Sequence, residues 1–490
     1  MKQLSGLDTM FLNLETNAVP MHVGGVAILD AATAPVGFGF ESLKRHIEKR
    51  LHLLPMFRRR LLSSPLALDQ PYWIEDPDFD LENHVRHRAL PAPGTPQQLS
   101  DFICDVISTR LDRSMPLWRI YYVEGLEGGK VAVITKIHHA CIDGVSGAEM
   151  LSTLLDFSPE GRAIAAPEQP WTPDTIPSQR ELLITSLRNF SQSPGEAFRL
   201  FKESAGVALT LARDLLAARV EALRDPSGPP EEPAFDRDNT MKAGPTAPRM
   251  LFNTTITARR SYAYRSLSLA DVKFVKNTFG CSVNDVVLCV SAEALRHYLN
   301  DKHSLPSQSL IAAIPVSVRT EEEKGTGGNK VSMARTSLGT HIADPVERLR
   351  AIGNRMGKVK QSMKAVPAKL IMDWANVPAP ALMAQAARLY ENFSIQNFHA
   401  PPYNLVISNV PGPSQPLYFA GARVLANYPV SIPYHGLAFN ITVMSYQNSL
   451  DIGLTGHRGT VPDPEVILDG MVAALDTLKT AAGKLLKKSA

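Results

Sequence analysis

The chain is organised around Lys136-Ile137-His138-His139-Ala140-Cys141-Ile142-Asp143-Gly144, in which two histidines and an aspartate follow an apolar run. The residues before the histidines, from Val131 to Ile137, are mostly β-branched and follow the turn-forming pair Gly128-Gly129, so they predict a buried strand. Successive side chains of a strand point to opposite faces, and His138 and His139 therefore cannot both reach one substrate if the strand continues through them. We expect one histidine to act as a base and the other to be structural.

Asp143 and Gly144 close this stretch. Asp143, just before the turn-permitting Gly144, is suited to orient an imidazole or to hold the turn through an ion pair. The spacing alone leaves three other interpretations open: histidines satisfied inside a core, an aspartate that caps a helix over 145–155, and a metal site. The metal interpretation lacks any HExxH or CxxC spacing, so we assign no metal ligand.

The composition fits a globular protein of two or three domains. The chain has 490 residues, of which 44% are apolar, and 51 basic against 48 acidic residues give a net charge of +3. This balance indicates no nucleic-acid partner. The four cysteines have no disulfide or zinc spacing, which favours free thiols in a reducing cytoplasm. The start lacks a signal peptide pattern, and no apolar run approaches the roughly 20 residues that span a bilayer, so we expect at most peripheral membrane contact.

Three parts of the chain differ in character. Residues 1–157 alternate strand-like and helix-like segments, residues 158–250 contain many prolines, and residues 251–490 again mix strands and helices. We therefore expect an N-terminal lobe, a linker and a C-terminal lobe with these boundaries. Within the linker, residues 195–223 predict an amphipathic helix that either packs across the lobes or lies on a lipid surface.

A helix beginning at Pro96 has the clearest start signal in the first lobe. Thr95 and Gln98 form a capping-box pair, and Pro96 takes the first helical position. Apolar residues then recur at helical spacing, and we assign them to the core: Leu99, Phe102, Ile103, Val106, Ile107 and Leu111.

The sequence from His138 to Gly144 resembles the HHxxxDG signature of the acyltransferase superfamily that includes chloramphenicol acetyltransferase and the condensation domains of peptide synthetases. Further stretches are similar to the bacterial bifunctional wax ester synthase/diacylglycerol acyltransferase family, and they run in the family's order over essentially the whole chain. These stretches are Leu4-Ser5-Gly6-Leu7-Asp8, Pro20-Met21-His22-Val23-Gly24, Pro116-Leu117-Trp118, Asn284-Asp285 and Ser408-Asn409-Val410-Pro411-Gly412-Pro413.

The resemblance implies an α/β fold of two chloramphenicol-acetyltransferase-like lobes, with mixed sheets flanked by helices and an active-site tunnel at the lobe interface. It implies that His139 is the general base, that His138 belongs to the same motif, and that Asp143 is structural and pairs with an arginine of the other lobe. Arg319, at the end of a predicted strand, resembles that arginine. Gly144 completes the motif.

Two further motifs each have a functional and a structural interpretation. Asn284 and Asp285 either position the substrate or the histidine, or cap the helix that we predict over 283–299. Pro116, Leu117 and Trp118 either line the acyl tunnel or belong to the core. The family resemblance favours the functional interpretation of Asn284. It supports a place near the site for Pro116, Leu117 and Trp118 without distinguishing packing from catalysis.

The resemblance implies an O-acyltransferase that moves a long-chain acyl group from acyl-CoA to diacylglycerol or to a long-chain fatty alcohol. Acyl-CoA is then a substrate, no cofactor is required, and no acyl-enzyme forms. The sequence also lacks the GxSxG nucleophile elbow of lipase-type enzymes. We expect a cytoplasmic protein on the inner membrane face or on lipid droplets. The alternatives are a non-catalytic lipid-binding or droplet protein and an amide-forming condensation enzyme; a glycerolipid acyltransferase of the HxxxxD type lacks its EGTR-like partner motif here.

Overall fold

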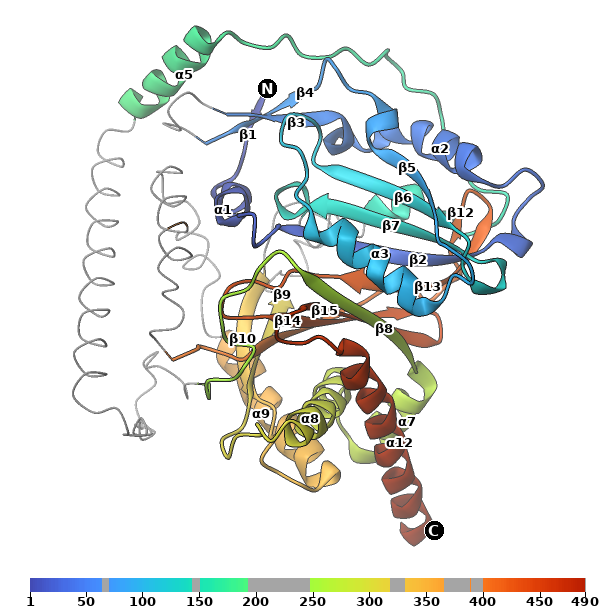
Figure 1. Ribbon diagram of the computed structural model, residues 1–490, viewed down its shortest axis with the longest axis vertical. Helices are drawn as coiled ribbons and strands as arrows, with labels where there is room; N and C mark the ends of the chain where they lie inside the picture. Colours follow the sequence, from blue (N-terminus) through green and yellow to red (C-terminus); the bar gives the residue numbers. More distant parts are fainter. Residues whose placement is uncertain are drawn as a thin grey trace.

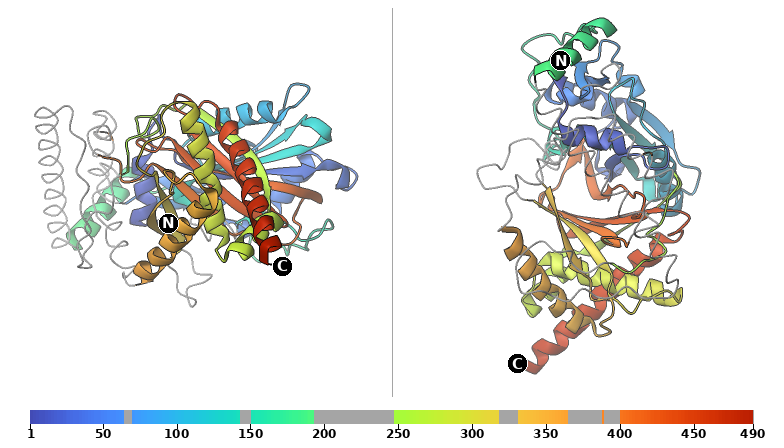
Figure 2. Two further views of the ribbon diagram at one scale, coloured as in Figure 1. Left: turned by 90° about the horizontal axis from the view of Figure 1, so that it is seen from below. Right: turned by 90° about the vertical axis from the view of Figure 1, so that its left-hand side faces the viewer.

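The computed structural model describes residues 1–63, 70–142, 150–192, 247–317, 331–364, 388 and 400–489. Two six-stranded sheets lie one above the other, each with its own helices (Figure 1). The side view shows the same two lobes stacked along the long axis of the molecule (Figure 2). This mixed α/β architecture agrees with the expected fold class.

The first sheet has the order β12-β13-β2-β7-β6-β5. Only the β5–β6 pair is parallel among its pairings. Helices α2 (Phe40–Glu48) and α3 (Pro96–Ser108) belong to this lobe. The strands are β2 (His22–Asp30), β5 (Val85–Ala89), β6 (Trp118–Glu124), β7 (Val131–His138), β12 (Tyr418–Phe419) and β13 (Ala422–Val430).

Both faces of strand β7 are buried, which explains its unbroken apolar sequence. Val131, Val133 and Ile137 join one core cluster with α2, whereas Ala132 and Ile134 join another with α3. A strand covered on both sides has no solvent face that would require alternating polar residues. The capping box predicted at Thr95 is confirmed, since its hydroxyl accepts from the Gln98 N–H at 3.2 Å.

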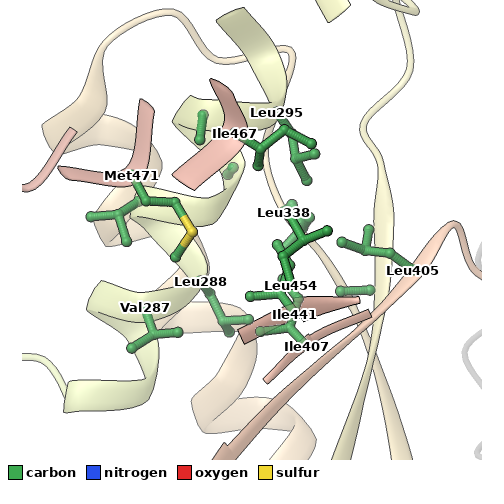
Figure 3. Close-up of a cluster of buried hydrophobic side chains, with 14 of the residues drawn as sticks. Val287, Leu288, Leu295, Leu338, Leu405, Ile407, Ile441, Leu454, Ile467 and Met471 are labelled. Atoms are coloured by element: carbon green, nitrogen blue, oxygen red, sulfur yellow. The ribbon is translucent and has the colours of Figure 1, made fainter. Parts of the chain in front are cut away.

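The second sheet has the order β10-β9-β11-β14-β15-β8, with parallel pairs β9–β11 and β11–β14. Four helices lie on its far side from the first lobe: α7 (Leu269–Phe279), α8 (Val283–Asp301), α9 (Pro345–Lys364) and α12 (Pro464–Ser489). Figure 3 shows side chains of α8 and α12 meeting those of the sheet. The strands are β8 (Arg260–Ser268), β9 (Ile311–Ser317), β10 (Val331–Ser337), β11 (Leu405–Val410), β14 (Phe439–Tyr446) and β15 (Ser449–His457).

Strand β13 joins the two lobes. It lies in the range 251–490, yet it pairs with β2 and so completes the sheet of the first lobe. It also packs against β14 and β15 of the second sheet. The Tyr262 hydroxyl of β8 donates to the Pro429 carbonyl at 3.0 Å, and a Cβ at Gly453 would lie 1.8 Å from the same oxygen. The boundary expected at residue 251 therefore does not separate the two sheets cleanly.

A small third sheet and a short helix flank the end of β7. The sheet has the order β1-β4-β3, formed by β1 (Lys2–Gln3), β3 (Arg59–Leu62) and β4 (Tyr72–Glu75). Helix α1 (Gly6–Leu14) follows β1, and α5 (Gln179–Gln192) lies at the periphery (Figure 1). Within the described ranges, none of the helices alone is long and apolar enough to cross a membrane; α7 and α8, bent by 103°, meet that test of length and composition only as a pair.

Candidate active site

The two histidines lie where β7 ends. His138 is the last residue of the strand, and His139 opens a 3₁₀ turn, η7 (His139–Cys141). The His138 N–H donates to the Leu117 carbonyl at 2.9 Å, and the His139 N–H donates to the Met21 carbonyl at 2.9 Å. Hydrogen bonds to two different segments thus fix the backbone at His138 and His139.

His138 is fully buried, with 0% of its surface exposed. Its Nδ1 accepts a hydrogen bond from the Ala140 N–H at 3.0 Å, so the hydrogen of the neutral ring lies on Nε2. Nε2 faces Glu15 Oε1 at 3.6 Å. Burial lowers the pKa of His138 to about 3, and the ring is therefore neutral at physiological pH. Because Nδ1 of this buried imidazole accepts a hydrogen bond from the turn, His138 is suited to stabilise the backbone conformation there.

His139 differs from its neighbour because it is only partly buried. Its ring stacks on Phe11 of α1, with centroids 3.9 Å apart and planes 17° apart. Stacking occupies a ring face, whereas proton transfer uses the nitrogens in the ring plane. Of the two histidines, His139 therefore has the geometry of a working base.

A buried polar cluster lies behind His138. Glu15 Oε1 is 3.3 Å from His22 Nε2, and Glu15 Oε2 accepts from Arg113 at 2.8 Å. Burial raises the pKa of Glu15, but the hydrogen bond with His22 and the nearby positive charge, including that of Arg113, outweigh burial and lower it to about 2. The carboxylate is therefore ionised although only 1% of its side chain is exposed.

The other predicted site residues fall in three places. Leu117 and Trp118 are buried, at 0% and 1% exposure, and Trp118 donates from its indole to the Phe57 carbonyl at 2.8 Å and stacks on Phe57. These contacts are typical of core residues. Pro116, just before Leu117, is also buried. Asp143, Gly144 and Arg319 lie outside the described residues, as does the helix predicted over 195–223.

Asp285 caps helix α8. Its Oδ2 accepts from the Ser282 N–H at 2.8 Å, and the Ser282 hydroxyl accepts from the Asp285 N–H at 3.2 Å, which is a reciprocal capping box. Asn284 lies beside it in the first turn and is partly buried. The structure therefore gives Asp285 the capping role that its residue type suggested. In the described part of the chain, no group of three or more histidine, cysteine or carboxylate side chains is arranged to hold a metal ion.

Comparison with known proteins decides the family. The sequence profile of the wax ester synthase/diacylglycerol acyltransferase catalytic domain matches residues 4–287, and that of the C-terminal domain of the same family matches residues 327–479. The chain belongs to this family. The resemblance inferred from the motifs is thereby confirmed, and the protein is an acyltransferase.

Relatives match over nearly the full chain of this family member. A Mycobacterium tuberculosis protein named "Putative diacyglycerol O-acyltransferase" is 34% identical over 479 residues, which are 98% of this chain and 90% of the relative. The solved structure of the wax ester synthase/diacylglycerol acyltransferase from Marinobacter aquaeolei VT8 is 30% identical, with a TM-score of 0.70 over 99% of this chain and all of that one. The starter condensation domain of rhizomide synthetase, at 12% identity and a TM-score of 0.53 over 98% of this chain and 94% of the domain, shares the fold alone.

Sequence reasoning missed the residues that support the histidine pair in this acyltransferase. Phe11 and Glu15 lie more than 120 residues before the motif, and no local pattern links them to it. A signal was nevertheless present, because Asp8, Phe11 and Glu15 recur at helical spacing and so share one face of α1 and its end. An aromatic and two carboxylates on one face of a short helix indicate a polar contact surface.

Proposed function

We propose that the protein transfers a long-chain acyl group from acyl-CoA to diacylglycerol, to a long-chain fatty alcohol, or to both, with His139 as the general base. The observation that supports this assignment is that the two histidines have different surroundings. His138 is buried beside Glu15, whereas His139 is partly exposed and its ring stacks on Phe11. The names of the relatives support the substrates.

The reaction follows from what an imidazole at this position can do. His139 removes the proton from the acceptor hydroxyl, and the oxygen attacks the thioester carbonyl of acyl-CoA. The tetrahedral intermediate collapses as the carbon–sulfur bond breaks, and the proton passes to the departing thiolate. The products are an ester and CoA, and the balance requires no cofactor and no acyl-enzyme. The acyl chain contributes roughly 0.8 kcal/mol of binding free energy for each buried methylene, so a long apolar site selects substrates by chain length.

The test is thiol release from palmitoyl-CoA with dipalmitoylglycerol or hexadecanol. His139→Ala should lower kcat by about 100- to 10,000-fold, which is the usual contribution of a general base. The matched control is His297→Ala, because His297 is a histidine of α8 whose side chain is 67% exposed. Full activity of His139→Ala would refute the assignment. Absence of thiol release by the wild-type protein would refute the reaction and favour the lipid-binding or amide-forming alternatives.

We further infer that the protein meets its apolar substrates on a membrane or lipid-droplet surface, at the cytoplasmic side. The last turns of α12 project beyond the second lobe (Figure 1) and expose Leu485 and Leu486, at 37% and 48%, between the exposed Lys484 and Lys487. Apolar side chains flanked by lysines suit the interface of an anionic bilayer. Co-sedimentation with phosphatidylglycerol vesicles should fall several-fold in Leu485→Glu/Leu486→Glu; equal binding by wild type and variant would contradict this contact.

A further inference from the structure

Helix α1 contacts the histidine turn through residues that all lie on one of its sides. The helix is capped by Ser5, whose hydroxyl accepts from the Asp8 N–H at 3.1 Å. Phe11 stacks on His139, Glu15 faces His138, and the carboxylate of Asp8 is close enough to Cys141 to contribute, after burial, to the raised pKa of its thiol. From its first turn at Asp8 to its C-cap at Glu15, the helix thus follows the motif in the opposite direction, from residue 141 back to residue 138.

The contact with Phe11 fixes the orientation of the His139 ring and leaves its nitrogens uncovered by the phenyl ring. At a centroid separation of 3.9 Å and an interplanar angle of 17°, the phenyl ring covers one face of the imidazole. Rotation of the imidazole about its Cβ–Cγ bond would drive its edge into the phenyl ring. The nitrogens lie at the edge of the imidazole, in the ring plane, which the phenyl ring does not cover.

Glu15 acts on the same turn through His138. The His138 ring is bound at Nδ1 by the Ala140 N–H, and its protonated Nε2 faces the Glu15 carboxylate. The carboxylate is itself fixed: Arg113 donates to Oε2 at 2.8 and 3.2 Å, and the Met21 N–H donates to Oε1 at 3.4 Å. Arg113 also donates to the Leu12 carbonyl at 2.6 Å, which ties this cluster to the end of α1.

We propose that α1 is the positioning element of the catalytic histidine, with Phe11 setting the plane of the His139 ring and Glu15 anchoring the turn through His138. Neither residue touches the reacting atoms, so both act through the histidines. This proposal rests on the assignment of His139 as the base. A small displacement of a positioned catalytic group lowers turnover by as much as about 100-fold, while substrate binding is little affected.

The first experiment compares Phe11→Leu with Phe11→Tyr, and uses Leu14→Ala as the control on the same helix, because Leu14 is 36% exposed. Phe11→Leu should lower kcat about 10- to 100-fold and change KM for acyl-CoA less than threefold. Phe11→Tyr keeps an aromatic ring that can stack on His139, and its kcat should be within about threefold of wild type. Wild-type kcat in Phe11→Leu, or an equal loss in Leu14→Ala, would overturn the proposal.

A second readout does not depend on turnover. The ring current of Phe11 should shift the imidazole carbon-bound proton signals of His139, assigned by their loss in His139→Ala, to high field in the NMR spectrum. Phe11→Leu should abolish that shift and Phe11→Tyr should keep it. If the wild-type protein releases no thiol, the proposed reaction fails, yet the shift still tests the contact, and an unchanged His139 signal in Phe11→Leu overturns it.

Glu15→Gln tests the anchor separately and also serves if Phe11→Leu does not fold. It keeps the side-chain size and removes the charge that faces His138. We expect a fall in kcat of about 10-fold and a displaced His139 signal, with KM for acyl-CoA unchanged. An unmoved signal together with kcat within twofold of wild type would overturn the role of Glu15.

Discussion

The carboxylate of Asp451 on β15 accepts a hydrogen bond from the backbone N–H of Asn427 on β13 at 2.8 Å, and so links the two sheets directly. Asp451 is completely buried, and its other oxygen accepts from the Ser266 hydroxyl of β8 at 2.7 Å. Burial raises the pKa of Asp451, and the hydrogen bonds from Asn427 and Ser266 oppose that rise. The contact between the lobes therefore includes a buried polar link.

Replacing Asp451 with alanine should lower the free energy of unfolding by about 3 kcal/mol, because buried donors lose their acceptor. Denaturant titration followed by circular dichroism would measure the loss. Ser266→Ala is the matched control, since it removes one donor and leaves the acceptor in place, and we expect a loss of about 1 kcal/mol. Asp451 also accepts from the Ser449 hydroxyl at 2.8 Å, so similar losses in both variants would show that the bonds to Asn427 and Ser449 together contribute little.

Two glycine substitutions should have opposite effects. A Cβ at Gly453 would lie 1.8 Å from the Pro429 carbonyl oxygen, so Gly453→Ala must push β13 away from β15. We expect a loss of about 3 kcal/mol or more, or failure to fold. Gly357 lies in α9 with no atom within 4 Å of its Cβ position, and Gly357→Ala should stabilise the protein by up to about 1 kcal/mol. Thermal unfolding of the pair would test this, and equal melting temperatures would contradict it.

His138 should be needed for stability more than for proton transfer. His138→Ala removes the acceptor of the Ala140 N–H inside the protein and should cost about 1 to 3 kcal/mol. His138→Asn offers a side-chain oxygen near the position of Nδ1 and should recover part of the stability and part of kcat. If His138→Asn retained wild-type stability but had no measurable turnover, His138 would have to act in the chemistry itself.

Acid should destabilise the protein through buried neutral histidines. Burial lowers the pKa of His46 to about 4, with the hydrogen bond to the Leu154 carbonyl opposing, and burial likewise lowers the pKa of His22 to about 4. Because the unfolded chain binds these protons near pH 6.5 and the folded chain does not, their stabilising contribution is complete above pH 6.5 and is lost as pH falls towards 4.

His46→Gln tests this linkage at one site. Between about pH 4.5 and 6, the free energy of unfolding of His46→Gln should change less with pH than that of the wild-type protein. The two slopes should differ by about 1.4 kcal/mol per pH unit. The glutamine keeps an N–H that can donate to the Leu154 carbonyl. Identical slopes would show that His46 titrates equally in both states.

The buried guanidinium of Arg348 should tolerate no replacement. It is 0% exposed, pairs with Glu293, and donates to the Ile342 and Ala343 carbonyls. Arg348→Lys keeps the charge but cannot reproduce this fork of donors, and buried carbonyls left without a donor should cost about 1 to 3 kcal/mol. Arg350→Ala, at an exposed position two residues on, should be neutral in the same denaturation experiment.

Local sequence signals predicted several elements well. Thr95, Pro96 and Gln98 define the start of α3, and the β-branched run from Val131 defines β7, because capping and strand propensity act over a few residues. The amphipathic pattern of residues 40–54 predicts a single helix. In the structure α2 ends at Glu48 and 3₁₀ turns follow, since Pro55 disfavours a helical conformation at Leu54.

Contacts between distant segments could not be predicted in the same way. The pairing of β13 with β2 joins residues about 400 positions apart, and a strand's sequence does not state its partner. For the same reason the family motif identified the histidine pair, whereas Glu15 and Phe11, which support it, emerged only from the folded arrangement.

The place of β13 in the first sheet sets an order of events during synthesis. The ribosome makes β2, β5, β6 and β7 early, but the strand that covers the β2 edge arrives only with residues 422–430 of 490. Until then the nascent N-terminal half carries an open strand edge, which is a template for pairing with other chains. A chain truncated before residue 422 should therefore aggregate, and a synthetic peptide of residues 417–431 supplied in trans should rescue it.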